Sequence, residues 1–315
     1  MTGQKTLFSV FMKEIFSFIS GYFTAINKKV LSACTVLVAI LIYINFHFGV
    51  DEYIDNQQSI SDFFYYRYLI FLIAFGLPYI FYTAFTGKNH FKSPVLFFLV
   101  IISPAIFSWK IAMSTQVHLL DDYSWNYYWN QIIYWPARLI VLIMILFSIW
   151  SVFYNKESFF GFTIKNFKWK PYLIMLCIMV PLIAAASTQN DFQHMYPRMK
   201  DVQGALLEVN NGWLYKLLHE LAYGSDFISI ELFFRGFLIL AFVKVAGKDA
   251  ILPMACFYCT IHFGKPLGEC ISSYFGGILL GIVVYNTRSI IGGLVVHLGI
   301  AWLMELGGYI GNSLL

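Results

Sequence analysis

Long apolar runs with few charges recur along the chain from residue 30 to residue 311. A helix needs about 20 mostly apolar residues to cross ~30 Å of hydrocarbon. The runs do not alternate apolar with polar residues, as the strands of a membrane barrel would. The pattern therefore predicts membrane-spanning helices over residues 30–48, 62–86, 94–113, 131–153, 172–188, 226–246, 249–263, 267–286 and 289–311.

The composition agrees with this pattern. Hydrophobic residues make up 59% of the chain, charged residues make up 12%, and the mean hydropathy is +0.68. Soluble domains usually carry about 25% charged residues. These values exclude a soluble enzyme, a nucleic-acid-binding protein and a disordered chain. We therefore expect an all-α, polytopic membrane protein with about eight to nine transmembrane helices and a C-terminal four-helix catalytic-type core.

Basic residues fall mainly on one side of the predicted membrane. The opposite loops hold the acids Asp51, Glu52, Asp55, Asp121 and Asp122 and few bases. Because Lys and Arg are enriched in cytoplasmic loops, we expect a cytoplasmic N-terminus and a multi-pass protein of a bacterial plasma (inner) membrane. With this orientation the basic side collects Lys5, Lys13, Lys28, Lys29, Lys88, Lys92, Lys156, Lys165, Lys168, Lys170, Lys244, Lys248 and Arg288.

The same pattern divides the chain into four segments. Residues 1–29 mix apolar with charged and small residues, which predicts an amphipathic helix at the membrane interface. Residues 30–188 form a membrane region of five spans with few polar residues inside them. Residues 189–225 form a non-cytoplasmic loop with a short helix. Residues 226–315 form a core of four helices that holds most of the ionisable groups at membrane depth.

Charged side chains inside this four-helix core indicate a functional site, because a charge in a membrane span is costly. Glu231 and Arg235 stand at i and i+4, so they lie on one helix face and can pair. The next predicted span carries His262 and the last carries His297. Taken separately, Glu231 and Arg235 could be a structural ion pair, and each histidine could be a packing residue. Their concentration in one block favours a site.

The order of these residues resembles the CPBP family of intramembrane proteases, which includes the type II CAAX prenyl endopeptidases and the bacteriocin-immunity Abi proteins. The family pattern is Glu-Glu-x-x-x-Arg on one helix and Phe-x-x-x-His on the next. An intervening helix and then His-x-x-x-Asn (or Asp or Ser) follow. The segment Glu231-Leu-Phe-Phe-Arg235 matches most specifically, and His262 and His297 follow in the expected order. The resemblance covers about residues 220–311.

The resemblance implies a hydrolytic mechanism, with three departures in this chain. In the family a glutamate and the first histidine activate water, while the second histidine and the asparagine stabilise the oxyanion. Here Ile230 replaces the first glutamate, Tyr258 replaces the phenylalanine and Ala301 replaces the last polar residue. Glu231 would then act as base from one position along, ~100° around the helix. Arg235 would orient the acidic group.

Other residues could support the site or hold a metal. Glu269 begins the span after His262, and Glu305 lies eight residues after His297. The alternative for both acids is a helix-end residue that faces the lipid headgroups. The glutamate mechanism requires no cofactor. Zinc bound by His262, His297 and Glu231 is the alternative, although no His-Glu-x-x-His motif is present. The five cysteines lie in or beside apolar runs and do not predict a disulfide framework.

We therefore expect an intramembrane endopeptidase, a hydrolase with Glu231, Arg235, His262 and His297 as its catalytic residues. Its partners would be the lipid bilayer and a membrane-associated protein or peptide substrate, with no nucleic acid. The alternative is a catalytically silent CPBP relative that acts as a membrane binding, immunity or scaffold partner. The two lost polar positions favour that alternative. A transporter would show internal repeats, and the sequence shows none.

Overall fold

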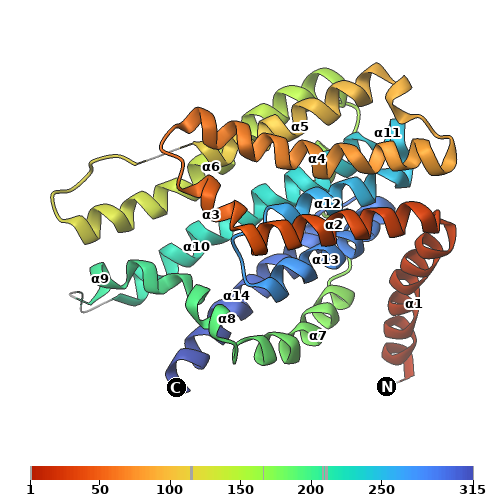
Figure 1. Ribbon diagram of the computed structural model, residues 1–315. Coiled ribbons are helices and arrows are strands. Elements are labelled where there is room, and N and C mark those ends of the chain that lie inside the picture. The colour runs from red at the N-terminus through yellow and green to blue at the C-terminus, as the bar shows by residue number, and fades with distance from the viewer. Residues whose placement is uncertain (1, 114–115, 166, 208, 210–211, 315) are drawn as a thin grey trace. The chain divides into compact units, whose positions relative to one another are not determined.

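The computed structural model describes residues 2–113, 116–165, 167–207, 209 and 212–314 (Figure 1). Every regular element among these residues is a helix, which confirms the predicted all-α class. The chain folds into two compact units that interleave along the sequence. The first unit comprises Met1–Ala112, Tyr154–Phe167 and Leu232–Gly293, and the second comprises Met113–Phe153, Lys168–Glu231 and Leu294–Leu315.

Within the described residues, six helices are long and apolar enough to cross a membrane. They are α2 (Lys28–Phe48), α4 (Ile60–Thr86), α5 (Pro94–Ala112), α6 (Tyr123–Phe153), α13 (Leu267–Thr287) and α14 (Ile291–Leu314). A seventh span results if α7 (Lys170–Ala186) and the segment Asn190–Leu206, bent by 98° from it, count as one. The protein is thus a multi-pass membrane protein.

The predicted number of eight to nine spans was too high. The predicted span 249–263 is α12 (Ile251–Thr260), whose ten residues are all buried and extend only ~15 Å. The predicted span 226–246 corresponds to three elements: the end of α10 (Gly212–Ile230), the π-helical segment η4 (Glu231–Ala241) and α11 (Val243–Ala246). Hydropathy alone cannot separate a helix buried in protein from one that faces lipid, because both are apolar.

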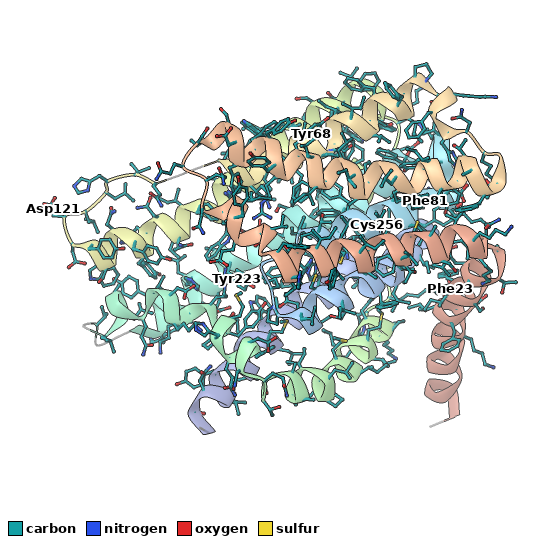
Figure 2. The ribbon with its side chains drawn as sticks, in the orientation of Figure 1. Phe23, Tyr68, Phe81, Asp121, Tyr223 and Cys256 are labelled. Atoms are coloured by element: carbon teal, nitrogen blue, oxygen red, sulfur yellow. The ribbon has the colours of Figure 1, made fainter. Side chains whose placement is uncertain are left out.

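The first unit is built around α12 and η4. α12 packs against α2, α4 and α13, and η4 is buried along its whole length. Phenylalanine rings from four helices fill this interior, with centroids 4.8 to 6.1 Å apart. They are Phe71 and Phe75 of α4, Phe107 of α5, Phe233 and Phe234 of η4, and Phe257 of α12. Figure 2 shows Cys256 of α12 within the same interior.

The outer faces of the spans carry large apolar side chains that are exposed. Val36, Ile40 and Tyr43 of α2 are examples, and α4 presents Ile80 and Phe85. Soluble monomers rarely expose continuous apolar surface of this kind. The exposed faces are therefore those expected to contact lipid.

The second unit joins α6 to α10 and α7 to α14. The Tyr128 hydroxyl of α6 donates a hydrogen bond of 2.8 Å to the Tyr215 carbonyl of α10. A Cβ on Gly299 of α14 would lie 2.6 Å from Leu176 Cδ2 of α7. A small residue at this position lets the two helices approach closely.

The first helix, α1 (Thr2–Ala25), packs against α13 and buries Tyr22 near its end. It is not among the six spans. The prediction of an amphipathic interfacial helix concerns residues 1–29, and residue 1 and the side chains of residues 2–12 lie outside the described part.

Candidate active site

One face of α10 brings Glu231 to α14. Gly224, Phe227 and Glu231 are spaced i, i+3 and i+7, which places them on a common helix face. A Cβ on Gly224 would lie 3.3 Å from Leu298 Cδ1, so the glycine lets the two helices approach closely. The Phe227 ring packs edge-on against the His297 ring, with centroids 4.8 Å apart and an interplanar angle of 82°. These contacts fix the orientation of the imidazole.

Glu231 and His297 form a hydrogen bond inside the second unit. His297 Nδ1 lies 2.9 Å from Glu231 Oε1. In a hydrogen bond between a carboxylate and a neutral imidazole, Nδ1 donates the hydrogen and Nε2 carries the lone pair. The Glu231 side chain is 0% exposed and that of His297 is 14% exposed. The imidazole is therefore the member of the pair that water or a substrate can reach.

Glu231 is also the first residue of η4, where α-helical hydrogen bonding gives way to the π pattern of i→i+5 bonds. Short π-helical segments occur frequently at functional sites. Arg235 lies in η4 and is buried, with its guanidinium carbon 3.8 Å from the centroid of the Tyr258 ring. This cation–π contact compensates part of the cost of burying the charge.

Tyr258 also holds His262, in the first unit. His262 Nδ1 lies 3.0 Å from the Tyr258 carbonyl oxygen, and the two rings meet edge-on at 4.7 Å. A carbonyl oxygen only accepts, so Nδ1 carries the hydrogen and Nε2 keeps the lone pair. Tyr258 thus contacts both Arg235 and His262. The sequence had indicated it only as a ring in place of the family's phenylalanine.

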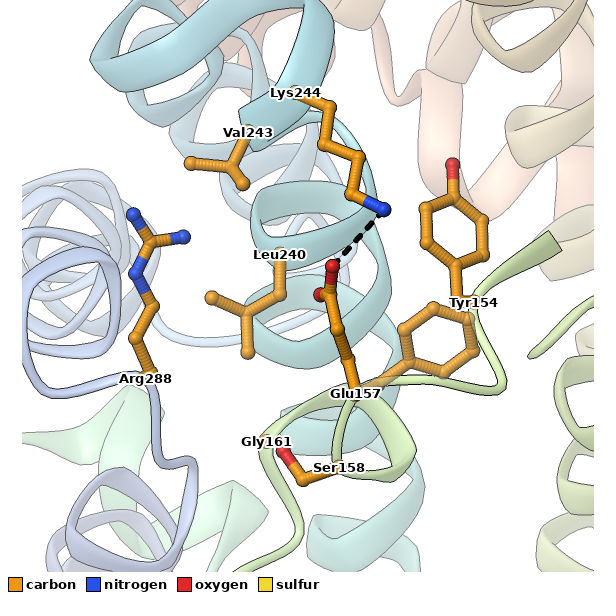
Figure 3. Close-up of a pocket in the computed structure, with 9 residues that line it drawn as sticks. Tyr154, Glu157, Ser158, Gly161, Leu240, Val243, Lys244 and Arg288 are labelled. Atoms are coloured by element: carbon orange, nitrogen blue, oxygen red, sulfur yellow. Dashed lines mark ion pairs between the residues drawn. The ribbon is translucent and has the colours of Figure 1, made fainter.

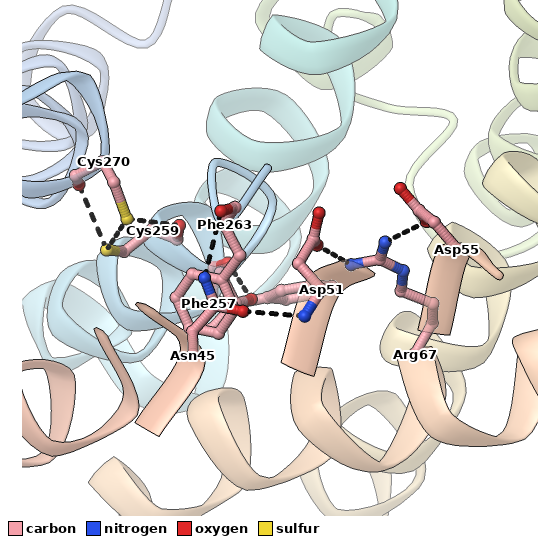
Figure 4. Close-up of polar contacts among 9 residues, drawn as sticks. Asn45, Asp51, Asp55, Arg67, Phe257, Cys259, Phe263 and Cys270 are labelled. Carbon is pink, nitrogen blue, oxygen red and sulfur yellow. Dashed lines mark hydrogen bonds and ion pairs between the residues drawn. The ribbon is translucent and has the colours of Figure 1, made fainter. Parts of the chain in front are cut away.

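The turn after His262 is anchored by the N-terminal spans (Figure 4). Asn45 of α2 donates from Nδ2 to the Phe263 carbonyl at 3.0 Å, and its Oδ1 accepts the Asp51 N–H at 2.9 Å. Asp51 lies in α3 (Val50–Asp55) and pairs with Arg67 of α4. Burial raises the pKa of the Asp51 carboxyl, and the Arg67 guanidinium opposes that shift. The first spans thus help to position His262.

Each of the two acids expected to support the site interacts with the N-terminus of a helix. Glu305 Oε1 accepts the Arg198 N–H at 2.9 Å, and Oε2 lies 3.4 Å from the Met199 nitrogen. These are the first donors of the short helix η3 (Arg198–Val202), which Glu305 therefore caps. Glu269 is half-buried in the first turn of α13, where a carboxylate interacts favourably with the helix N-terminus.

A further acid, Glu220 of α10, was not indicated by the sequence. Burial, and then the nearby charge of Glu305, raise the pKa of Glu220 to about 7. Burial and the charge of Arg198 lower the pKa of the adjacent His219 to about 4. The sequence gives no sign that these two side chains are buried, because their burial depends on how the second unit packs.

The residues present do not assemble a zinc site within either unit. Among the described residues, no group of three or more His, Cys, Asp or Glu is placed to hold a metal ion. Glu231 and His297 supply two ligands, whereas catalytic zinc uses three protein ligands. None of the five cysteines forms a disulfide, although the sulfur atoms of Cys259 and Cys270 lie 4.0 Å apart.

The apolar spans and the buried glutamate–histidine pair are features that the resemblance to the CPBP family predicts. Residues 225–303 match the family model described as Type II CAAX prenyl endopeptidase Rce1-like. This stretch includes Glu231, Arg235, His262 and His297. This match supports membership of the CPBP family for the C-terminal quarter of the chain, as the sequence pattern had indicated.

The other comparisons found no relatives. No curated protein matches the chain. No solved structure matches it either. The family match begins near the end of α10, so the helices before residue 225 lie outside it.

Proposed function

We propose that this protein is an intramembrane endopeptidase of the CAAX-protease-like type, which hydrolyses a peptide bond in a membrane-associated protein. The observation that carries the proposal is the hydrogen bond between buried Glu231 and partly exposed His297. A carboxylate that fixes the Nδ1–H form of a histidine leaves Nε2 able to accept a proton, as in Ser-His-Asp hydrolases. This role suits a glutamate displaced by one position, because it does not require Glu231 to touch the water.

The proposed reaction needs only the chain's own groups and water. His297 Nε2 takes a proton from a water molecule, whose oxygen attacks the carbonyl carbon of the scissile bond. The C–N bond then breaks, and the imidazolium returns the proton to the leaving amine. Glu231 stabilises the imidazolium through the 2.9 Å hydrogen bond. Within the first unit, we propose His262 as an acid–base group and Arg235, held by Tyr258, as a positioning residue.

The same proposal includes a location. The distribution of Lys and Arg supports a cytoplasmic N-terminus in a bacterial plasma (inner) membrane. The partners proposed are the lipid bilayer and a protein or peptide segment that the membrane brings to the site.

Reconstitution in liposomes tests the activity. Three probes are used: a peptide ending in a farnesylated Cys-a-a-x sequence, the same peptide without the lipid, and solubilised total membrane proteins whose new chain ends are read by mass spectrometry. We expect Glu231→Gln and His297→Asn to reduce the rate of cleavage by roughly 10²–10⁴-fold, the usual contribution of a positioned acid–base group. His118→Asn is the matched control, because His118 is exposed in the second unit.

The comparison between variants decides the proposal. If wild type and both site variants leave the same chain ends at the same rate, the Glu231–His297 pair is not catalytic. If wild type cleaves none of the three probes, the chain is instead a silent relative that works by binding. Cleavage of the farnesylated peptide alone would identify a prenylated substrate, and cleavage of both peptides would show that the lipid is not recognised.

A further inference from the structure

A cavity of about 430 Å³ lies in the first unit, and it is independent of the proposed peptidase function (Figure 3). Three separate parts of the chain form its walls: the turn after α6, the end of η4 with α11, and the residue that ends α13. The side chains that matter for its chemistry are Tyr154, Glu157, Ser158, Leu240, Lys244 and Arg288.

The backbone of this cavity is strained. Phe160 has a φ of 40° and Arg288 has a φ of 57°, and these are the non-glycine residues of the described chain with positive φ. Both line the cavity. A helix that ends in the left-handed conformation usually has glycine there, so Arg288 at the end of α13 costs conformational energy. Strain of this kind persists mainly at functional and ligand-binding sites.

The cavity walls are also rigidly joined. The Ile290 N–H donates to the Gly161 carbonyl at 2.9 Å, and the Ser289 hydroxyl donates to the Thr163 carbonyl at 2.6 Å. A Cβ on Gly236 would lie 2.7 Å from the Phe160 carbonyl oxygen. The turn η2 (Phe159–Gly161) is thus fixed against both η4 and the turn after α13. The cavity is a shaped part of the fold.

The charges of the cavity leave one cation in excess. Lys244 Nζ lies 2.9 Å from Glu157 Oε1, so this pair is neutral. Arg288 forms no ion pair with any residue that the structure describes, and its guanidinium lies 5.1 Å from the centroid of the Tyr285 ring. In Figure 3, Arg288 lies on the other side of Leu240 from the Lys244–Glu157 pair. The site therefore suits an anion.

We propose that this cavity binds a phosphate-bearing anion, either the headgroup of an acidic phospholipid or free phosphate. The Arg288 guanidinium matches two phosphate oxygens with paired N–H donors. The Ser158 hydroxyl supplies a further donor, and Leu240 and Val243 supply an apolar wall for the rest of a lipid. Basic cavities at the ends of membrane helices are where acidic headgroups bind.

The test uses the purified full chain in phosphatidylcholine nanodiscs. One arm adds phosphatidylglycerol, with added phosphatidylcholine as its reference. The second arm adds sodium phosphate, with sodium chloride at equal ionic strength as its reference. Binding is read by native mass spectrometry and by the shift in Tm. Arg288→Gly removes the cation but keeps the positive φ that the turn requires, so we expect its Tm without anion to be no lower than that of wild type.

The matched control is Lys165→Gln, which removes one charge from an exposed position outside the cavity, in the segment that follows η2. We expect wild type and Lys165→Gln to prefer the anion over its reference at least tenfold, and Arg288→Gly to lose that preference. Glu157→Gln frees Lys244 and should strengthen binding. Preference in the lipid arm alone identifies a headgroup, and preference in the phosphate arm identifies free phosphate. Equal preference in Arg288→Gly and wild type, or none in wild type, overturns the proposal.

Discussion

The Glu231–His297 pair of the second unit and the cavity around Arg288 in the first unit are both polar, yet they are held in place differently. Glu231 is fully buried and its position depends on a charge-assisted hydrogen bond. The cavity keeps its charges exposed, and backbone contacts that only glycine allows hold its walls. The first region should therefore be sensitive to loss of a charged partner, and the second to added volume.

The largest effect should come from breaking the buried pair. His297→Ala leaves the Glu231 carboxylate buried without its imidazole, and breaking a buried pair in this way costs about 3–5 kcal/mol. The free energy of unfolding in detergent, measured by denaturant titration of wild type and variant, gives the value. His118→Ala, at an exposed histidine, should change it by less than about 0.5 kcal/mol. If both variants lower the free energy of unfolding by the same amount, burial does not make the Glu231–His297 pair more important for stability than an exposed histidine.

A smaller loss is expected from adding a methyl group beside the cavity. Gly236→Ala would place its Cβ 2.7 Å from the Phe160 carbonyl oxygen, so the wall must shift at a cost of about 1–3 kcal/mol. The control is Gly276→Ala in α13, where nothing lies within 4 Å of the added atom. That change should stabilise the protein by about 0.4–1 kcal/mol. Thermal unfolding of both variants compares them, and a Tm for Gly236→Ala at or above that of Gly276→Ala would refute the packing argument.

The smallest effect is expected on the pH dependence of stability, through Glu220 of the second unit. Burial and the charge of Glu305 raise the pKa of Glu220 from its ordinary value of 4.5 to about 7. Between these values folded Glu220 binds more protons than unfolded Glu220, so its contribution to stability falls as the pH rises through this window and is level above it. Glu220→Gln should flatten this part of the curve of Tm against pH and raise the Tm at pH near 8 relative to wild type. Parallel curves would show that Glu220 does not contribute.

The sequence predicted the helical membrane class. It also indicated Glu231, Arg235, His262 and His297 as candidate site residues, because charges at membrane depth are rare enough to be informative. It could not predict which acid would meet His297. Glu231 and His297 are 66 positions apart, and their contact depends on how Gly224 lets α10 approach α14. The span count failed for a related reason, since α12 is apolar through burial inside the first unit.

The cavity around Arg288 left almost no trace in the sequence. Its walls come from three distant segments, and its character depends on backbone conformation at Phe160 and Arg288. The one available signal is that Asn286-Thr287-Arg288-Ser289 ends a helix without the glycine usual at that place.

The π-helical geometry of η4 has a consequence for insertions and deletions. Removing one of the residues between Glu231 and Arg235 would turn Glu231 by about 100° relative to Arg235. Substitutions inside the segment leave this spacing intact. Natural variation between residues 232 and 241 should therefore change the identity of side chains far more readily than it changes the number of residues.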